Sequence, residues 1–145
     1  MPWSRGQCLA SEFTCPDTLA ASHLYRAVTG PGQVANDAEQ RKKEKYSALS
    51  TQYQFVPIAI ETLGPVGDEA TAFFQDVGRR IIAVTREPRT MTFLWQRLSV
   101  AVQRGNAACV LGTDHWAEED TLTLGSDNVI FARFFIEHVI CIKLI

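Results

Sequence analysis

The residues of this sequence best placed for chemistry are an acid on a short strand and two lysines on the helix that follows it. Residues 7–15 alternate as a strand does, and Glu12 falls on the less bulky of the two faces. Residues 34–49 are helical in composition, yet Lys42 and Lys45 lie in the seam that should be apolar. A carboxylate is a hard oxygen ligand for a divalent metal ion, and an ammonium group contacts a phosphate as a point charge. The lysine stems could instead cover apolar surface beside small alanines, and the residue pattern alone leaves both interpretations open.

A second acid follows a second expected strand. Residues 53–63 contain the apolar run Phe55-Val56-Pro57-Ile58-Ala59-Ile60, and Gly64-Pro65 bounds it, as is typical of a buried strand. Pro57 has no N–H to donate, which predicts a bulge or the less paired side of the strand. Glu61 comes next and would lie at the strand's end.

The cysteines and histidines lack the spacing of metal ligands. The four cysteines include no C-x-x-C pair, and no histidine lies at ligand spacing from them, so we expect no zinc site and no disulfides. The N-terminus has no basic segment followed by an apolar run, which predicts an intracellular protein, nuclear or cytoplasmic, that is not secreted. Residues 129–145 are apolar but interrupted by charges and shorter than a spanning helix, so we expect no membrane partner.

The elements that must position these residues predict the α/β class. A chain of 145 residues, 46% hydrophobic, is expected to form one domain with one core. Two amphipathic helices should follow the second strand. Their apolar stripes contain Ala70, Phe73, Phe74, Val77, Ile81 and Val84, then Met91, Leu94, Leu98, Ala101, Val102 and Ala108. Beyond Thr113 the sequence turns acidic and then apolar, which predicts a domain over 1–113 and an unrelated extension over 114–145.

Three stretches of the chain resemble a known family. They read CLASEFTCPDTLAASHL, then EQRKKEKYSAL with YQFVPIAIETLG, then FLWQRLSVAVQRGNAACVLGT, and together they cover most of residues 7–113. They resemble the C-terminal region of invertebrate non-LTR retrotransposon polyproteins, where a restriction-like endonuclease domain of the PD-(D/E)XK type follows the reverse transcriptase. The resemblance implies an incomplete restriction-endonuclease-like core, formed by a short sheet with a crossover helix. It also implies descent from an enzyme that cleaves DNA with Mg²⁺.

The resemblance also gives roles to particular residues. Glu12, in SEFT, stands where the relatives have the aspartate of WDFT or WDVT. Lys45 and Tyr46 match the relatives' helical Lys-Tyr pair, which would explain a lysine in an apolar seam, because it would reach a strand carboxylate. We therefore expect the Glu12 carboxylate and the Lys45 ammonium to lie within one side chain's reach of each other and to face one cleft.

The departures from the family pattern imply an inactive protein. The RPDG-type segment that supplies the relatives' first acidic ligand is not present after Met1, and the first strands of the core would be missing with it. Pro16-Asp17 lies after the strand acid and is expected to start a helix. A single carboxylate binds Mg²⁺ weakly. Glu12 is thus at most one ligand, Glu61 is the first candidate for a second acid, and we expect no bound cofactor in this form.

Other interpretations remain open. The chain could be a non-catalytic module that binds DNA or RNA weakly through arginines of the two late helices, namely Arg79, Arg80, Arg97 and Arg104. It could also be an active nuclease completed by a second chain. The missing strands would leave an exposed sheet edge beside residues 7–15, through which the chain could associate with itself.

Overall fold

The computed structural model describes residue 3 and residues 6–111, with side chains described up to residue 107. The chain divides into two compact units, Met1–Met91 and Thr92–Ile145. The boundary expected at residue 113 and the extension 114–145 lie outside the described residues, so they stay predictions. None of the described helices is long and apolar enough to cross a membrane.

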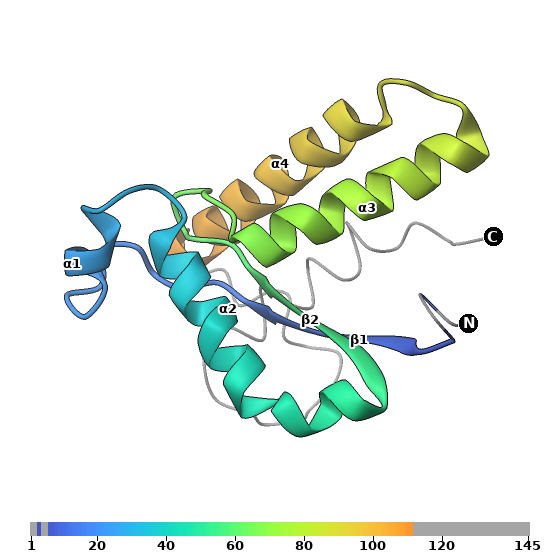
Figure 1. Cartoon of the computed structure of the whole chain (residues 1–145). Helices are drawn as coiled ribbons and strands as arrows, with labels where there is room; N and C mark the ends of the chain where they lie inside the picture. The colour runs from blue at the N-terminus through green and yellow to red at the C-terminus, as the bar shows by residue number, and fades with distance from the viewer. Residues whose placement is uncertain (1–2, 4–5, 112–145) are drawn as a thin grey trace. The chain divides into compact units, whose positions relative to one another are not determined.

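The first unit contains a parallel pair of strands, which confirms the α/β class (Figure 1). Strand β1 (Cys8–Thr14) pairs with β2 (Tyr53–Ala59), with Cys8 opposite Tyr53 and Thr14 opposite Ala59. Helix α2 (Gln33–Lys45) and the 3-10 helix η1 (Ser47–Thr51) lie between them in the chain. The expected strand, helix, strand unit is confirmed, although the α-helix ends at Lys45 and the residues up to 49 continue as a 3-10 turn.

The remaining helices follow the predicted pattern in part. The helix start expected at Pro16-Asp17 was wrong, because turns follow these residues and the first helix begins at Leu24. Helix α1 (Leu24–Ala27) is a single turn with no buried residue, and α3 (Asp68–Thr85) starts shortly after β2. In α3 the stripe residues Ala70 and Phe74 are buried. Val84 is 82% exposed, so the prediction that it belongs to the buried stripe was wrong. It lies in the last turn of the helix, beyond the part that packs.

Helix α4 (Thr90–Leu111) forms most of the described part of the second unit. Its buried residues are Leu94, Leu98, Ala101 and Val102, all of them on the expected stripe. Their spacing of three and four residues gives the helix one apolar face.

Helix α2 covers one face of the sheet by means of small residues. Ala35 and Ala38 of the helix form a buried cluster with Ala59 of β2. Alanine side chains allow a helix to approach a sheet closely, and they leave room beside them for longer side chains of the same helix face. The face of α2 that carries these alanines is therefore held against β2, the strand that pairs with the Glu12 strand β1.

The outer edge of β2, the edge away from β1, offers no free N–H group at Pro57 or at Ala59. The Ile60 N–H donates to the Thr14 carbonyl at 3.1 Å, so even-numbered residues of β2 direct their backbone groups toward β1. Odd-numbered residues face the outer edge. There the Ala59 N–H donates to the Glu39 carboxylate at 3.4 Å, and Pro57 has no N–H. Pro57 thus lies on the less paired side of the strand, as its missing donor predicts.

Candidate functional site

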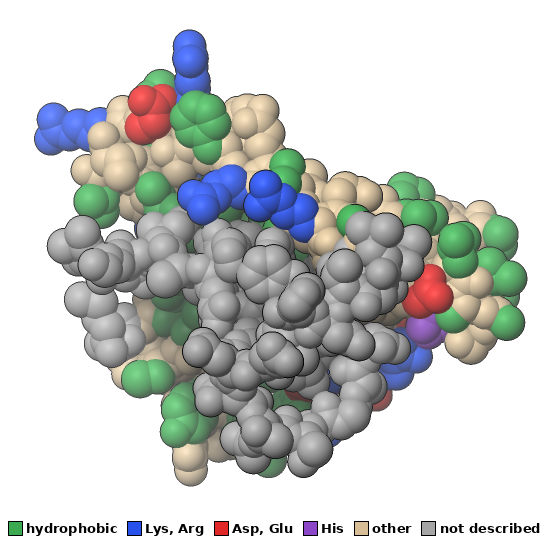
Figure 2. All heavy atoms as spheres, turned by 180° about the vertical axis from the view of Figure 1, so that it is seen from behind, with side chains coloured by type: hydrophobic (Ala, Val, Ile, Leu, Met, Phe, Trp, Pro, Cys, Tyr) green, Lys and Arg blue, Asp and Glu red, His purple; other side chains and the backbone are tan. Residues whose placement is uncertain are grey.

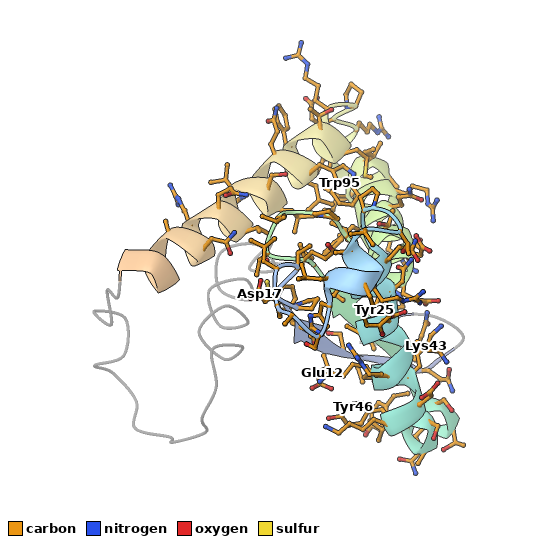
Figure 3. All side chains as sticks on the ribbon, turned by 90° about the vertical axis from the view of Figure 1, so that its left-hand side faces the viewer. Glu12, Asp17, Tyr25, Lys43, Tyr46 and Trp95 are labelled. Carbon is orange, nitrogen blue, oxygen red and sulfur yellow. The ribbon has the colours of Figure 1, made fainter. Side chains whose placement is uncertain are left out.

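Glu12 lies beside a lysine of α2, but that lysine is Lys42. The Glu12 Oε1 and the Lys42 Nζ form an ion pair, and the two side chains are 32% and 23% exposed. The other carboxylate oxygen, Oε2, is buried and has no hydrogen-bond partner within the part of the chain that the structure describes. This pair joins the middle of β1 to the last turn of α2, and Glu12 lies near the Tyr46 end of that helix in Figure 3.

Lys45 is directed to its neighbour Tyr46. Its ammonium nitrogen lies 4.7 Å from the centre of the Tyr46 ring, and that ring packs on Phe55 of β2 with 5.1 Å between centroids. The pKa of Lys45 is raised, chiefly by its hydrogen bond to the Tyr46 side chain and to a smaller degree by the charge of Glu12. The lysine in direct contact with Glu12 is thus Lys42, and the expected closeness of Lys45 to Glu12 stays a prediction.

Glu61, the candidate second acid, holds the start of α2. Its Oε1 accepts hydrogen bonds from the N–H groups of Val34 and Ala35, each at 3.2 Å, and its Oε2 accepts one from the Thr18 hydroxyl at 3.1 Å. The N-cap residue of α2 is Gly32, which has no side chain to do this. With Glu61 only 1% exposed, its carboxylate acts as a helix cap supplied from the end of the neighbouring strand.

Glu12 and Glu61 do not converge on one point. Glu12 is opposite Pro57 in the strand register, and Glu61 comes four residues later, so the two acids are separated by about 13 Å along the sheet at the usual rise per residue. In residues 3 and 6–111 no group of three or more His, Cys, Asp and Glu could hold a metal ion. Magnesium needs near-octahedral oxygen ligands, and the acids present here do not fit it.

A second buried acid, Glu39, was not singled out from the sequence. It is 2% exposed and caps the start of α3: Oε2 accepts the Glu69 N–H at 2.9 Å and Oε1 accepts the Ala70 N–H at 3.0 Å. Burial raises the pKa of this carboxyl group, and its backbone hydrogen bonds oppose that rise. A Cβ added at Gly67 would lie 2.3 Å from the Glu39 carboxyl carbon, so the glycine gives the carboxylate room.

The sequence contained a weak signal for Glu39. It follows Ala38 in the apolar seam of α2, so it had to lie near the face directed at the sheet. An acid in that position is seldom left without donors, because burying an unpaired charge is costly. What the sequence could not indicate is that the donors would be the first N–H groups of a helix about thirty residues later.

Two polar pairs complete the support of α2 at its N-terminal half. Asn36 and Asp68 exchange hydrogen bonds, with the Asp68 N–H donating to the Asn36 side chain at 2.8 Å and the Asn36 amide donating to Asp68 at 3.0 Å. The Arg26 guanidinium of α1 contacts both carboxylate oxygens of Asp37 and lowers the pKa of Asp37. These pairs orient α2 and leave Lys42 and Lys45 at its other end.

The arginines proposed for nucleic-acid binding differ in their surroundings. Arg80 donates to Asp76 at 2.8 Å and to the Trp3 carbonyl at 3.2 Å, and its guanidinium lies 4.0 Å from the Trp3 ring centre. Arg79 also contacts Asp76, at 3.5 Å. On α4, Arg97 and Arg104 are exposed and seven residues apart, which places them on one side of the helix. On the face shown in Figure 2, the visible Lys and Arg side chains are interspersed with hydrophobic and uncharged surface.

Comparison with known proteins gave no match: no family model, curated protein or solved structure is similar to this chain.

Proposed function

We propose that this chain is a retroelement-derived remnant of a metal-dependent DNA endonuclease domain and that it is catalytically inactive in this form. The observation that carries the proposal is the arrangement around Glu12. The strand acid faces the lysine-bearing end of the helix that connects it to a parallel neighbour. That order of elements is the one the family resemblance implies for an incomplete restriction-endonuclease-like core.

The same site supports the proposed inactivity. A divalent ion would supply both the activated water and the charge stabilisation that phosphodiester cleavage needs. Glu12 is the one acid at this point of the described chain, its Oε1 is paired with Lys42, and Glu61 and Glu39 are occupied as helix caps. The residues that would hold Mg²⁺ in an active relative are therefore not assembled here.

A cleavage assay tests this proposal. We expect the purified chain to leave single-stranded and double-stranded DNA uncut in Mg²⁺ or Mn²⁺, and Glu12→Ala to behave as the wild type does. Nicking that requires metal and disappears in Glu12→Ala would refute the proposed inactivity. Cleavage that rises steeply with protein concentration would favour the alternative of a nuclease completed by a second chain.

Weak nucleic-acid binding through α4 is a second candidate function, and the observation that favours it is the exposure of Arg97 and Arg104 on one side of that helix. The double substitution Arg97→Ala with Arg104→Ala should reduce the slope of log binding constant against log salt concentration. The reduction should correspond to the loss of about two phosphate contacts. Arg79→Ala is the control, because it removes an exposed arginine from a different helix, α3. A gel shift at several salt concentrations measures this, and an unchanged slope in the double variant would exclude α4 as the contact surface.

A further inference from the structure

The ion pair at Glu12 suggests why this acid would not bind a metal ion even if the ion were abundant. We infer that the Lys42 ammonium occupies the position beside Glu12 that a divalent cation would need, so that the pair is a structural link between β1 and α2 which is closed to metal. The inference deepens the proposed function and rests on it in one respect, since that function is the reason to consider a metal at Glu12.

Both oxygens of Glu12 are unavailable to a metal ion. The Oε1 atom faces the Lys42 ammonium, and Oε2 is buried without a hydrogen-bond partner among the described residues. A divalent ion such as Mg²⁺ or Mn²⁺ needs several oxygen ligands and usually keeps some of its water. The buried Oε2 offers no room for a hydrated ion, and the Oε1 side already has a positive charge in contact.

The surrounding charges also oppose a second cation. The ammonium of Lys42 is in direct contact with this carboxylate. The two charges already neutralise each other, so a divalent ion added beside them would leave an excess of positive charge. Lys42 would repel that ion at short range, where solvent screens least.

Replacing the ammonium by a carboxylate should convert the closed pair into a cation site. Lys42→Glu would set two acids against each other, and their repulsion should lower the melting temperature in metal-free buffer. We expect Mn²⁺ at 10 mM to raise the melting temperature of this variant by several degrees and to leave the wild type unchanged, because a ligand that binds only the folded state stabilises it. NaCl at matched ionic strength is the reference.

Two controls assign the effect to the pair. Lys42→Gln removes the ammonium without adding an acid and should not respond to Mn²⁺. The double variant with Lys42→Glu and Glu12→Gln should lose the response. Full-length protein is used throughout, and circular dichroism confirms that each variant is folded.

Several results would overturn the inference. They include a folded Lys42→Glu variant that ignores Mn²⁺ and a wild type that gains stability from Mn²⁺ through Glu12. If Lys42→Glu does not fold, the electron spin resonance signal of free Mn²⁺ is measured instead, in the presence of wild-type protein. We expect the signal to persist. Its loss with the wild type, but not with Glu12→Gln, would contradict the inference. Metal-dependent DNA cleavage would contradict the proposed function instead, so the two failures are distinguishable.

Discussion

Glu39→Ala should lower the free energy of unfolding by about 3–5 kcal/mol, a large part of the stability of a chain this size. The carboxylate is 2% exposed and accepts hydrogen bonds from three backbone N–H groups, those of Ala59, Glu69 and Ala70. Alanine would leave these donors buried without an acceptor. Each such loss costs about 1–3 kcal/mol, and water that enters the new space would reduce the total.

The measurement is urea unfolding followed by circular dichroism. Glu44→Ala is the matched control, because Glu44 is an exposed acid of the same helix whose carboxylate accepts a hydrogen bond from the Gln40 side chain. It should change the free energy of unfolding by less than about 0.5 kcal/mol. Equal effects of the two substitutions would show that Glu39 does not cap α3.

The pH dependence of the Glu39 effect has a definite sign. Burial raises the pKa of Glu39 above its ordinary value of 4.5, so the folded state holds this proton more tightly than the unfolded state. Stability from this group is complete below pH 4.5 and is lost as the pH rises through the folded-state pKa. The melting temperature of the wild type relative to Glu39→Gln should thus be highest near pH 4 and fall toward pH 7. A difference that grows with pH would contradict this.

The Arg26–Asp37 pair should have the opposite dependence. Contact with Arg26 lowers the pKa of Asp37 below its ordinary value of 3.8, so its contribution is present above that pH and lost as the pH falls through the folded-state pKa. Both side chains are partly exposed, so solvent screens the pair and its contribution to stability is small. The buried Glu39 should therefore dominate the difference between pH 4 and pH 7.

Much of the first unit could be predicted from local pattern. Alternation indicated the strand that contains Glu12, an apolar run before Gly64-Pro65 indicated the second strand, and composition indicated the helix between them. The parallel pairing followed because a strand, helix, strand connection of this length favours it. The end of the α-helix at Lys45 was less predictable, since Leu49 still fits the helical seam but lies in the 3-10 turn.

The partner of Glu12 could not be chosen from the sequence. Lys42 and Lys45 are three residues apart and share one face of α2, but they differ by about 4.5 Å along the helix axis. Which of them meets Glu12 depends on how α2 is placed along the strand, and that placement is fixed by contacts at the helix's other end. Family matching selected Lys45, whereas the register of the packed helix brings Lys42 to the carboxylate.

The buried acids show a second limit of sequence interpretation. Glu61 was noted because it ends a strand, and a metal role was suggested for it, whereas Glu39 was not noted. In the structure each accepts N–H groups from the first turn of a helix that is distant in sequence. Caps of this kind lack the local signature of a capping box, because the acceptor comes from another element. Only the packed arrangement identifies them.

Glu61→Ala is expected to cost about 3–4 kcal/mol, because it removes the acceptor for the Val34 and Ala35 N–H groups and for the buried Thr18 hydroxyl. Thr18→Val, which removes only the hydroxyl, should cost about 1 kcal/mol. Urea unfolding measures both, and a cost below about 1 kcal/mol for Glu61→Ala would show that water can replace the cap.

Combining Glu61→Ala with Glu39→Ala tests whether the two caps support one helix. Glu61 fixes the start of α2, and α2 in turn carries Glu39 to the start of α3. If α2 shifts once Glu61 is removed, Glu39 has already lost part of its geometry, so the second substitution should cost less than it does alone. We expect the double variant to fall short of the sum of the single effects by at least about 0.5 kcal/mol. Strict additivity would mean that each carboxylate stabilises its own helix end independently and that α2 keeps its place on the sheet without Glu61.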